Sequence, residues 1–170
     1  KKSDVLFLPG VGSYSAAIKY IKKNKIDRKI FQHIKRKKKL VGICLGMQLL
    51  FEESSEFKKT KGLGIFKGKV ASLKKKINTL NYPVPNIGWN TISIKNKNSL
   101  FLNIKKKDFY FVHSYYAEPK DKKIITSYLN IDNKKICSSV SRNNINAFQF
   151  HPEKSGPEGI KLLRNLHKYI

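Results

Sequence analysis

The first fifty residues alternate between short apolar runs and amphipathic segments. Val5–Leu8 and residues 40–43 are apolar and rich in β-branched side chains, which is typical of buried parallel strands. Between these runs, apolar side chains recur three and four residues apart, as they do on one face of a helix. The spacing predicts one helix capped by Ser13 or Ser15 and another over residues 27–37, with these apolar positions: Ala17, Ile18, Ile21, Ile30, Phe31 and Ile34.

The pattern changes in the second half of the chain. Four β-rich runs, at residues 109–116, 124–129, 136–141 and 145–150, follow one another with only turn residues between them. Strands so closely spaced pair antiparallel, because a parallel pair needs a long crossover connection. Short strands are also predicted at 70–73 and 91–94, and Pro157 opens a C-terminal helix. We therefore expect one α/β domain over residues 1–170, with a mostly parallel sheet joined to an antiparallel portion.

A cysteine lies between two glycines where the second strand gives way to a helix-forming segment. Gly42, Cys44 and Gly46 form G-x-C-x-G, the thiol version of a nucleophile elbow, and the helix-forming residues begin at Met47. Glycines on either side relieve crowding, so that the central residue can hold a strained backbone. Nearby amides and the helix N-terminus predict a lowered thiol pKa. The alternative is a small buried cysteine packed under a helix.

A glycine-containing loop follows the first strand as well. Gly10 and Gly12 come directly after Val5–Leu8, where their backbone amides can face a ligand. Both loops are expected at the carboxyl edge of one parallel sheet, so the loop at 10–12 is a candidate second half of an oxyanion hole beside Cys44. An ordinary strand-to-helix turn would look similar.

A candidate general base follows the last predicted strand. His151 and Glu153 flank Pro152, which fixes the chain so that both side chains can point the same way. A histidine backed by a carboxylate is held in one tautomer, and its protonated form is stabilised. Alone, this segment would be interpreted as a strand-terminating turn. Together with the elbow it predicts a Cys44–His151–Glu153 triad.

Composition narrows the possible functions. The formal net charge of the 170 residues is +25, carried mostly by lysine, so nucleic-acid binding has to be considered. However, the lysines are scattered between apolar segments, as on solvated faces, and phosphate or base recognition favours arginine. No apolar run approaches the ~20 residues of a membrane span. Two cysteines make no disulfide framework, which indicates a cytoplasmic protein.

Motifs along the whole chain resemble those of class I glutamine amidotransferases. G-x-C-x-G and H-P-E are typical of the class. Other segments are more specific and are similar to the glutaminase subunits of imidazole glycerol phosphate synthase: P-G-V-G at 9–12, M-Q-L-L-F-E at 47–52, G-L-G at 62–64, P-N-I-G-W-N at 85–90, F-V-H-S-Y-Y at 111–116 and H-P-E-K-S-G at 151–156. The resemblance implies the flavodoxin-like three-layer fold of that class.

The resemblance also implies an activity, the hydrolysis of glutamine to glutamate and ammonia through a thioester on Cys44. His151 would be the base and Glu153 would orient it, while amides at Val11 and Leu45 would form the oxyanion hole. No cofactor or metal is implied. The positions that match substrate contacts of the family are Gly10, Gly12, Gln48, Glu52, Ser114 and Tyr115.

A partner is implied in the same way. The family delivers ammonia to a (β/α)₈ cyclase subunit in a cytoplasmic heterodimer, which forms imidazole glycerol phosphate and an aminoimidazole carboxamide ribotide for histidine biosynthesis. Trp89, Tyr110 and Lys154 match positions at the docking face, although Trp89 could be a core aromatic and Lys154 a plain surface charge. Alternatives are a different ammonia acceptor, such as a synthase that modifies cell-surface sugars, or a catalytically dead subunit.

One departure from the family pattern concerns the N-terminus. Family members begin with a strand and helix that carry a D-Y-G-x-G-N-like segment, and the present sequence starts instead at Lys1, close to Val5–Leu8. We therefore expect the natural domain to have a further strand and helix before residue 1.

Overall fold

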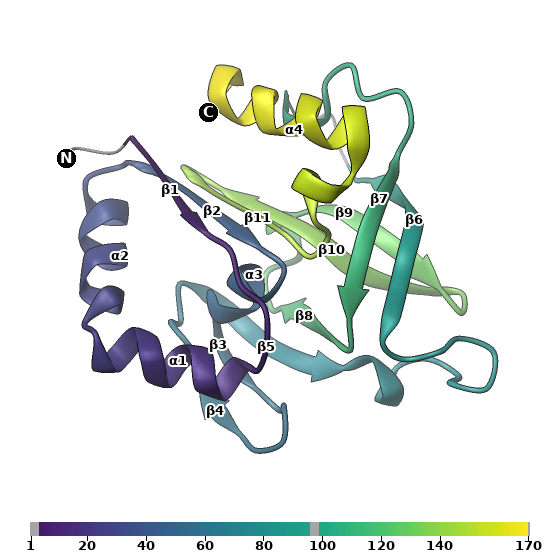
Figure 1. Cartoon of the computed structure of the whole chain (residues 1–170), viewed down its shortest axis with the longest axis horizontal. Helices are drawn as coiled ribbons and strands as arrows, with labels where there is room; N and C mark the ends of the chain where they lie inside the picture. Colours follow the sequence, from purple (N-terminus) through teal and green to yellow (C-terminus); the bar gives the residue numbers. More distant parts are fainter. Residues whose placement is uncertain (1–3, 96–98, 170) are drawn as a thin grey trace.

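The computed structural model describes residues 4–95 and 99–169 (Figure 1). In chain order, its longer helices and its strands are β1 (Val5–Leu8), α1 (Tyr14–Lys23), α2 (Ile26–Lys35), β2 (Lys39–Ile43), α3 (Leu45–Leu49), β3 (Phe51–Ser54), β4 (Thr60–Lys61), β5 (Phe66–Ser72), β6 (Asn86–Ile94), β7 (Asp108–His113), β8 (Tyr115–Pro119), β9 (Ile125–Ile131), β10 (Lys134–Arg142), β11 (Ile145–Phe148) and α4 (Gly156–Tyr169). Short 3₁₀ turns lie at Leu73–Lys75, Ser99–Phe101, Lys122–Ile124 and Pro152–Lys154.

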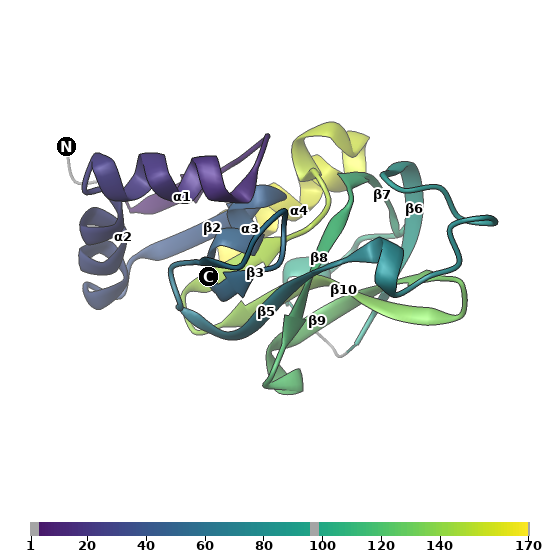
Figure 2. The same ribbon diagram turned by 90° about the horizontal axis from the view of Figure 1, so that it is seen from below.

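Seven of the described strands form one mixed sheet in the order β1-β2-β11-β10-β9-β6-β7. The β1–β2 and β2–β11 pairs are parallel, and the remaining pairs of this sheet are antiparallel. The α/β prediction is therefore confirmed, whereas the described sheet is more antiparallel than expected. A second sheet, in the order β4-β3-β5-β8, lies beside the first (Figure 2). The parallel part matters most for function, because the carboxyl ends of β2 and β11 meet at one edge.

Two apolar cores lie on opposite faces of the seven-stranded sheet. Strand β2 contributes to both, since neighbouring side chains of a strand point to opposite faces. Leu40 packs into a core that includes residues of α1, α2, α3 and β5, whereas Val41 packs into a core with Leu162 and Leu166 of α4. Figure 1 shows α1 and α2 on the side away from α4. Helices thus cover both faces of the strands that end at the elbow.

The sequence predictions agree with most element positions but miss several boundaries. Strands β5 and β6, predicted at 70–73 and 91–94, begin already at Phe66 and Asn86, and β3 and β4 were not predicted. Helix α1 begins after Ser13, whose hydroxyl accepts a hydrogen bond from the amide of Ala16. The predicted run over 109–116 is divided, because Ser114 separates β7 from β8 and the two strands join different sheets. The helix after Cys44 ends at Leu49, and Phe51, which has the helix-forming neighbours Leu49 and Leu50, begins strand β3 instead. Pairing of Phe51 with Phe66 on β5 overrides local propensity there.

The lysine clusters cover the surface at separate places. Lys22 and Lys23 end α1, Lys74–Lys76 follow β5 and Lys105–Lys107 precede β7, and all of these side chains are exposed. This distribution is that of solvated charges. None of the described helices is long and apolar enough to cross a membrane. Residues 4–95 and 99–169 contain no group of three His, Cys, Asp or Glu side chains that could hold a metal ion.

Candidate active site

Cys44 occupies a strained position between β2 and α3. Its φ and ψ are 54° and −113°, in a region that side chains other than glycine rarely adopt. Gly46 allows α3 to lie close to β1 at this turn. Any larger residue would clash, because a Cβ at Gly46 would lie 1.7 Å from the carbonyl oxygen of Leu8. The backbone amide of Cys44 also donates to the carbonyl of Phe148 at 2.7 Å. These contacts fix the thiol at the carboxyl edge of the parallel strands, as the G-x-C-x-G pattern predicts.

His151 and Glu153 lie just beyond β11, the strand next to β2. The Nδ1 of His151 donates to Oε1 of Glu153 across 2.7 Å, which leaves Nε2 as the basic nitrogen. The imidazole is buried, and its Nε2 has no hydrogen-bond partner among the described residues. A buried basic nitrogen without a hydrogen-bond partner costs stability. Its presence therefore indicates that Nε2 accepts a proton during a reaction.

Cys44 and His151 line the same cavity, of about 260 Å³. In the structure the thiol donates to the carbonyl of Val112 at 3.8 Å rather than to His151. A cavity of this size accommodates a small substrate and also allows the modest side-chain motions by which catalytic hydrogen bonds tighten on binding. The complete set of lining residues is Val11, Gly12, Cys44, Leu45, Gln48, Glu56, Pro85, Val112, His113, Ser114, Tyr115 and His151.

The thiol of Cys44 does not have the lowered pKa that the elbow predicts. Burial, the largest cause, raises the pKa to about 11, and the charge of Glu153 acts in the same direction. The amide of Leu45 donates to the sulfur and opposes this rise, as does the charge of Lys154. The short helix α3 is thus too weak an electrostatic partner to offset desolvation. At pH 7 the thiol is therefore protonated, so a base has to remove the proton when the substrate is attacked.

The predicted oxyanion and glycine positions fall partly inside the cavity. Val11, Gly12 and Leu45 line it, and the amide of Leu45 points at the sulfur. No described hydrogen bond fixes the direction of the amide of Val11. Gly10 lies outside the lining and packs against α3 instead, where a Cβ would meet the Cβ of Leu45 at 3.0 Å. Gly10 therefore allows the loop to approach the helix rather than forming the wall of the pocket.

Gln48, Ser114 and Tyr115 line the cavity as predicted for substrate contacts. The Nε2 of Gln48 donates to the carbonyl of Tyr115 and to Oε1 of Gln149, both at 2.9 Å. Both amide hydrogens of Gln48 are therefore committed within the protein. What Gln48 offers to a ligand is its carbonyl oxygen.

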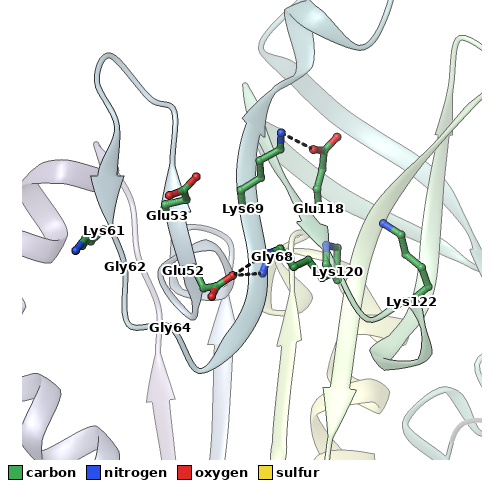
Figure 3. Close-up of a pocket in the computed structure, with 11 residues that line it drawn as sticks. Glu52, Glu53, Lys61, Gly62, Gly64, Gly68, Lys69, Glu118, Lys120 and Lys122 are labelled. Atoms are coloured by element: carbon green, nitrogen blue, oxygen red, sulfur yellow. Dashed lines mark hydrogen bonds and ion pairs between the residues drawn. The ribbon is translucent and has the colours of Figure 1, made fainter.

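Glu52 lies at a different cavity, of about 880 Å³, on the second sheet (Figure 3). Its carboxylate accepts from the amide of Gly68 and pairs with Lys67 at 3.0 Å and Lys120 at 3.7 Å. The amide hydrogen bond is the largest cause of the lowered pKa of Glu52. The structure therefore does not bring Glu52 to Cys44. The physical reason is that β3 begins at Phe51, so Glu52 follows the strand away from the elbow.

A different carboxylate, Glu56, lines the Cys44 cavity and was not predicted from the sequence. Its Oε2 accepts from the amide of Tyr14 at 2.5 Å, which holds it at the N-terminus of α1. The other oxygen remains available to a cationic group. The sequence spacing between Cys44 and Glu56 does not predict this position. The turn between β3 and β4 brings Glu56 to the cavity.

His113 forms part of the cavity wall and is neutral. Its Nδ1 donates to the carbonyl of Tyr115 at 2.9 Å, and its Nε2 accepts from the side-chain amide of Asn86 at 3.2 Å. Burial, followed by the charge of His151, lowers its pKa to about 4. A histidine held in this way keeps one tautomer at neutral pH. His113 is therefore a wall of the cavity rather than a proton carrier.

The three residues predicted at the docking face lie near His151, the predicted base; Trp89 and Lys154 are exposed and Tyr110 is half-buried. Trp89 is 58% exposed, which excludes a core position, and it packs edge-to-face on Tyr110 with ring centroids 6.2 Å apart. The carbonyl of Tyr110 accepts from the amide of His151. Lys154 is exposed at the end of the 3₁₀ turn that follows His151.

Comparison with protein families matches residues 1–168 to the model described as "Glutamine amidotransferase class-I". The chain belongs to the class I glutamine amidotransferase family. The matched residues include Cys44, His151 and Glu153.

Similar proteins within this family share a single printed name. "Imidazole glycerol phosphate synthase subunit HisH" of Pyrococcus furiosus is 47% identical over 99% of this chain and 83% of its own length. The protein of the same name from Aquifex aeolicus is 41% identical over 98% of this chain and 78% of its own length.

Solved structures with less similar sequences share the fold. "Structure of PurLQS from Thermotoga maritima" superposes with a TM-score of 0.70 at 19% identity, covering 98% of this chain and 79% of that one. "Crystal structure of glutamine amidotransferase" gives a TM-score of 0.64 at 14% identity, covering 98% and 76%. These likenesses place the class I amidotransferase chain in the expected α/β fold.

Proposed function

We propose that this amidotransferase is the glutaminase subunit of an imidazole glycerol phosphate synthase, which releases ammonia from glutamine for a cyclase partner in histidine biosynthesis. The observation that carries the proposal is the cavity lined both by a strained Cys44 and by a His151 whose Nε2 is basic, buried and without a partner among the described residues. The relatives that bear this name, at 47% and 41% identity, support the choice of pathway.

The chemistry follows from the geometry. Nε2 of His151 accepts the thiol proton while the sulfur forms a bond to the side-chain carbonyl carbon of glutamine, and the carbonyl electron pair moves onto oxygen. The resulting oxyanion lies near the amide of Leu45, and a donor of this kind contributes roughly 3 kcal/mol to transition-state stabilisation. As the oxyanion collapses, the carbon–nitrogen bond breaks and His151 returns the proton to the departing ammonia. Water, deprotonated by the same nitrogen, then hydrolyses the thioester.

Other residues that line the cavity would bind the α-amino and α-carboxylate groups of glutamine. Glu56 supplies the carboxylate that suits the α-ammonium group, and the carbonyl oxygen of Gln48 is the free acceptor beside it. Backbone groups at Ser114 and Tyr115 complete the wall along the junction of β7 and β8. Gly12 lines the opposite side at a positive φ of 89°. The set suits a small zwitterion with an uncharged side-chain amide.

The cyclase partner, expected to be a (β/α)₈ barrel, would dock on the aromatic pair of Trp89, which is exposed, and Tyr110, which is half-buried. Trp89 and Ile87 are 58% and 60% exposed on β6, and Val11 at the mouth of the cavity is 85% exposed. Apolar side chains this exposed around a catalytic cavity are a typical protein interface. Lys154 would meet an acidic group of the partner at the rim. The reduced, free cysteines Cys44 and Cys137 suit a cytoplasmic heterodimer.

The decisive experiment measures glutamate release by the protein with its cyclase partner. Cys44→Ala is expected to abolish release, whereas Cys137→Ala, the matched control, should retain it because Cys137 lies away from the cavity. Mass spectrometry of Cys44 during turnover should show the glutamyl thioester. Undiminished release by Cys44→Ala would exclude the mechanism. Glutamate release without transfer of nitrogen to the cyclase substrate would retain the glutaminase and reject the proposed pathway.

A further inference from the structure

A buried chain of two side-chain amides leads to the sulfur of Cys44. Nε2 of Gln149 lies 3.8 Å from Sγ, and Oε1 of Gln149 accepts from Nε2 of Gln48 at 2.9 Å. Gln149 is fully buried, and it does not line the cavity. A buried glutamine has to satisfy its polar groups within the protein, so its contacts are specific rather than incidental.

The direction of each hydrogen bond is fixed from one end. The carbonyl of Tyr115 on β8 only accepts, so the Gln48 amide has to present its nitrogen to it. The same nitrogen then donates to Gln149, which therefore has to turn its oxygen towards Gln48 and its nitrogen towards the sulfur. A backbone carbonyl in one sheet thus ensures that Cys44, which follows a strand of the other sheet, faces a donor rather than an acceptor.

We infer that Gln149 is a positioning residue for the nucleophile, which holds the sulfur of Cys44 by an N–H donor whose orientation Gln48 and the Tyr115 carbonyl set. This inference rests on the proposed function and goes beyond the triad. Thiolate sulfur accepts more strongly than thiol sulfur, so a fixed donor stabilises the charged form that attacks the substrate. The donor also restrains the sulfur at the point where His151 can reach its proton.

Groups other than Gln149 also influence the sulfur, and a test has to keep their contributions constant. Burial and the charge of Glu153 raise the pKa of the thiol, while the Leu45 amide, Lys154 and the Gln149 amide lower it. The carbonyl of Val112 accepts from the thiol, and His151 shares the cavity. Changes confined to Gln149 leave all of these in place.

The test replaces Gln149 in two ways and measures the sulfur directly. Gln149→Met removes the donor at similar size, and Gln149→Glu replaces it with a carboxylate. We expect alkylation of Cys44 by iodoacetamide at pH 8.5 to slow several-fold in Gln149→Met and about tenfold in Gln149→Glu, the effect of roughly one pKa unit. With the partner present, kcat for glutamine should fall in the same order, with KM within about threefold because Gln149 does not line the cavity.

Gln32→Glu is the matched control, since Gln32 is exposed on α2. A purely structural Gln149 predicts the opposite sign, because loosened packing would expose Cys44 and speed its alkylation. Faster or unchanged alkylation in a folded variant therefore overturns the inference, and if one variant fails to fold the other decides.

The unsubstituted Gln149 provides a second measurement. Replacing sulfur by oxygen in Cys44→Ser should shift the side-chain amide resonance of Gln149 and leave that of Gln32 unchanged. An unmoved Gln149 resonance would overturn the inference without any change at position 149. Because alkylation and this resonance report on the sulfur itself, they remain informative even if glutamine proves not to be the substrate.

Discussion

The backbone amide of His151 donates a 2.9 Å hydrogen bond to the carbonyl oxygen of Tyr110, whose ring packs against Trp89. One backbone hydrogen bond therefore connects His151, the proposed base, with the aromatic pair of Trp89 and Tyr110. Ser155, in the turn after His151, strengthens this connection by accepting from the amide of Tyr110 at 3.0 Å. Trp89 itself lies on β6 and packs against β7, the strand whose Tyr110 carbonyl holds the amide of His151.

The first prediction concerns this pair. Trp89→Ala should weaken cyclase binding about 30-fold or more, because a large aromatic side chain at the centre of an interface contributes at least about 2 kcal/mol. Isothermal titration calorimetry with the cyclase subunit measures the change. Tyr20→Ala, on the exposed face of α1, is the control and should bind as the wild type does. An affinity for Trp89→Ala within twofold of the wild type would place the interface elsewhere.

Glu153 is expected to act through the tautomer of His151. In Glu153→Gln the new amide can donate to Nδ1, which would place the proton on Nε2 and remove the base. We expect kcat to fall by about 10²-fold or more, with little change in KM because Glu153 does not line the cavity. Glu53→Gln, a surface carboxylate paired with Lys59, should keep full activity in the same steady-state assay. A loss limited to threefold would show that Glu153 is dispensable.

The pH dependence of Cys44 follows from its buried position. Because burial raises the pKa to about 11, the thiol is protonated at neutral pH and ionises only as the pH rises towards that value. Alkylation of the unliganded chain should therefore keep speeding up, by about tenfold per pH unit, from pH 7 to 10, whereas the cysteine of a short unstructured peptide levels off above about pH 9.5. Peptide-level mass spectrometry separates Cys44 from Cys137, whose pKa burial raises to about 12. A plateau for Cys44 below pH 8 would contradict the assignment.

Local patterns were sufficient to predict from the sequence the elbow and the sheet edge at which Cys44 and His151 lie. Gly42, Cys44 and Gly46 mark a strand-to-helix turn wherever it lies, and a base at the end of a neighbouring parallel strand has to reach the same sheet edge. The register confirms this, since Ile43 lies opposite Phe148. Where the chemistry depends on adjacent strand ends, order along the chain is enough to predict the site.

Local patterns could not predict the environment of the Cys44 thiol, nor which carboxylate of the protein lines the cavity. The pKa of Cys44 depends on how deeply the fold buries it, which no local motif encodes. Glu52 and Glu56 are four residues apart on one segment, and only the turn between β3 and β4 decides which of them reaches the cavity. The contact between Gln149 and Gln48 likewise depends on packing between separate elements.

Gly46 should be the glycine least tolerant of substitution near the site. A Cβ there would lie 1.7 Å from the carbonyl oxygen of Leu8, so Gly46→Ala has to push α3 away from β1. We expect the free energy of unfolding to fall by about 3 kcal/mol or more. Gly64→Ala is the control, because a Cβ at Gly64 meets nothing within 4 Å and only its φ of 66° is unfavourable, which costs about 1 kcal/mol. Urea unfolding that ranks the two variants equally would contradict this close approach.

The last prediction separates the two carboxylates. Glu56→Gln keeps an oxygen that can accept from the amide of Tyr14 but removes the negative charge, so it tests the charge alone. If Glu56 holds the α-ammonium of glutamine, KM should rise about tenfold or more while kcat changes little, since a charge-assisted hydrogen bond contributes about 1.5–3 kcal/mol. Glu52→Gln should leave KM unchanged, because its carboxylate pairs with Lys67 and Lys120 at the other cavity. The reverse result, a high KM for Glu52→Gln alone, would mean that glutamine binds against the second sheet.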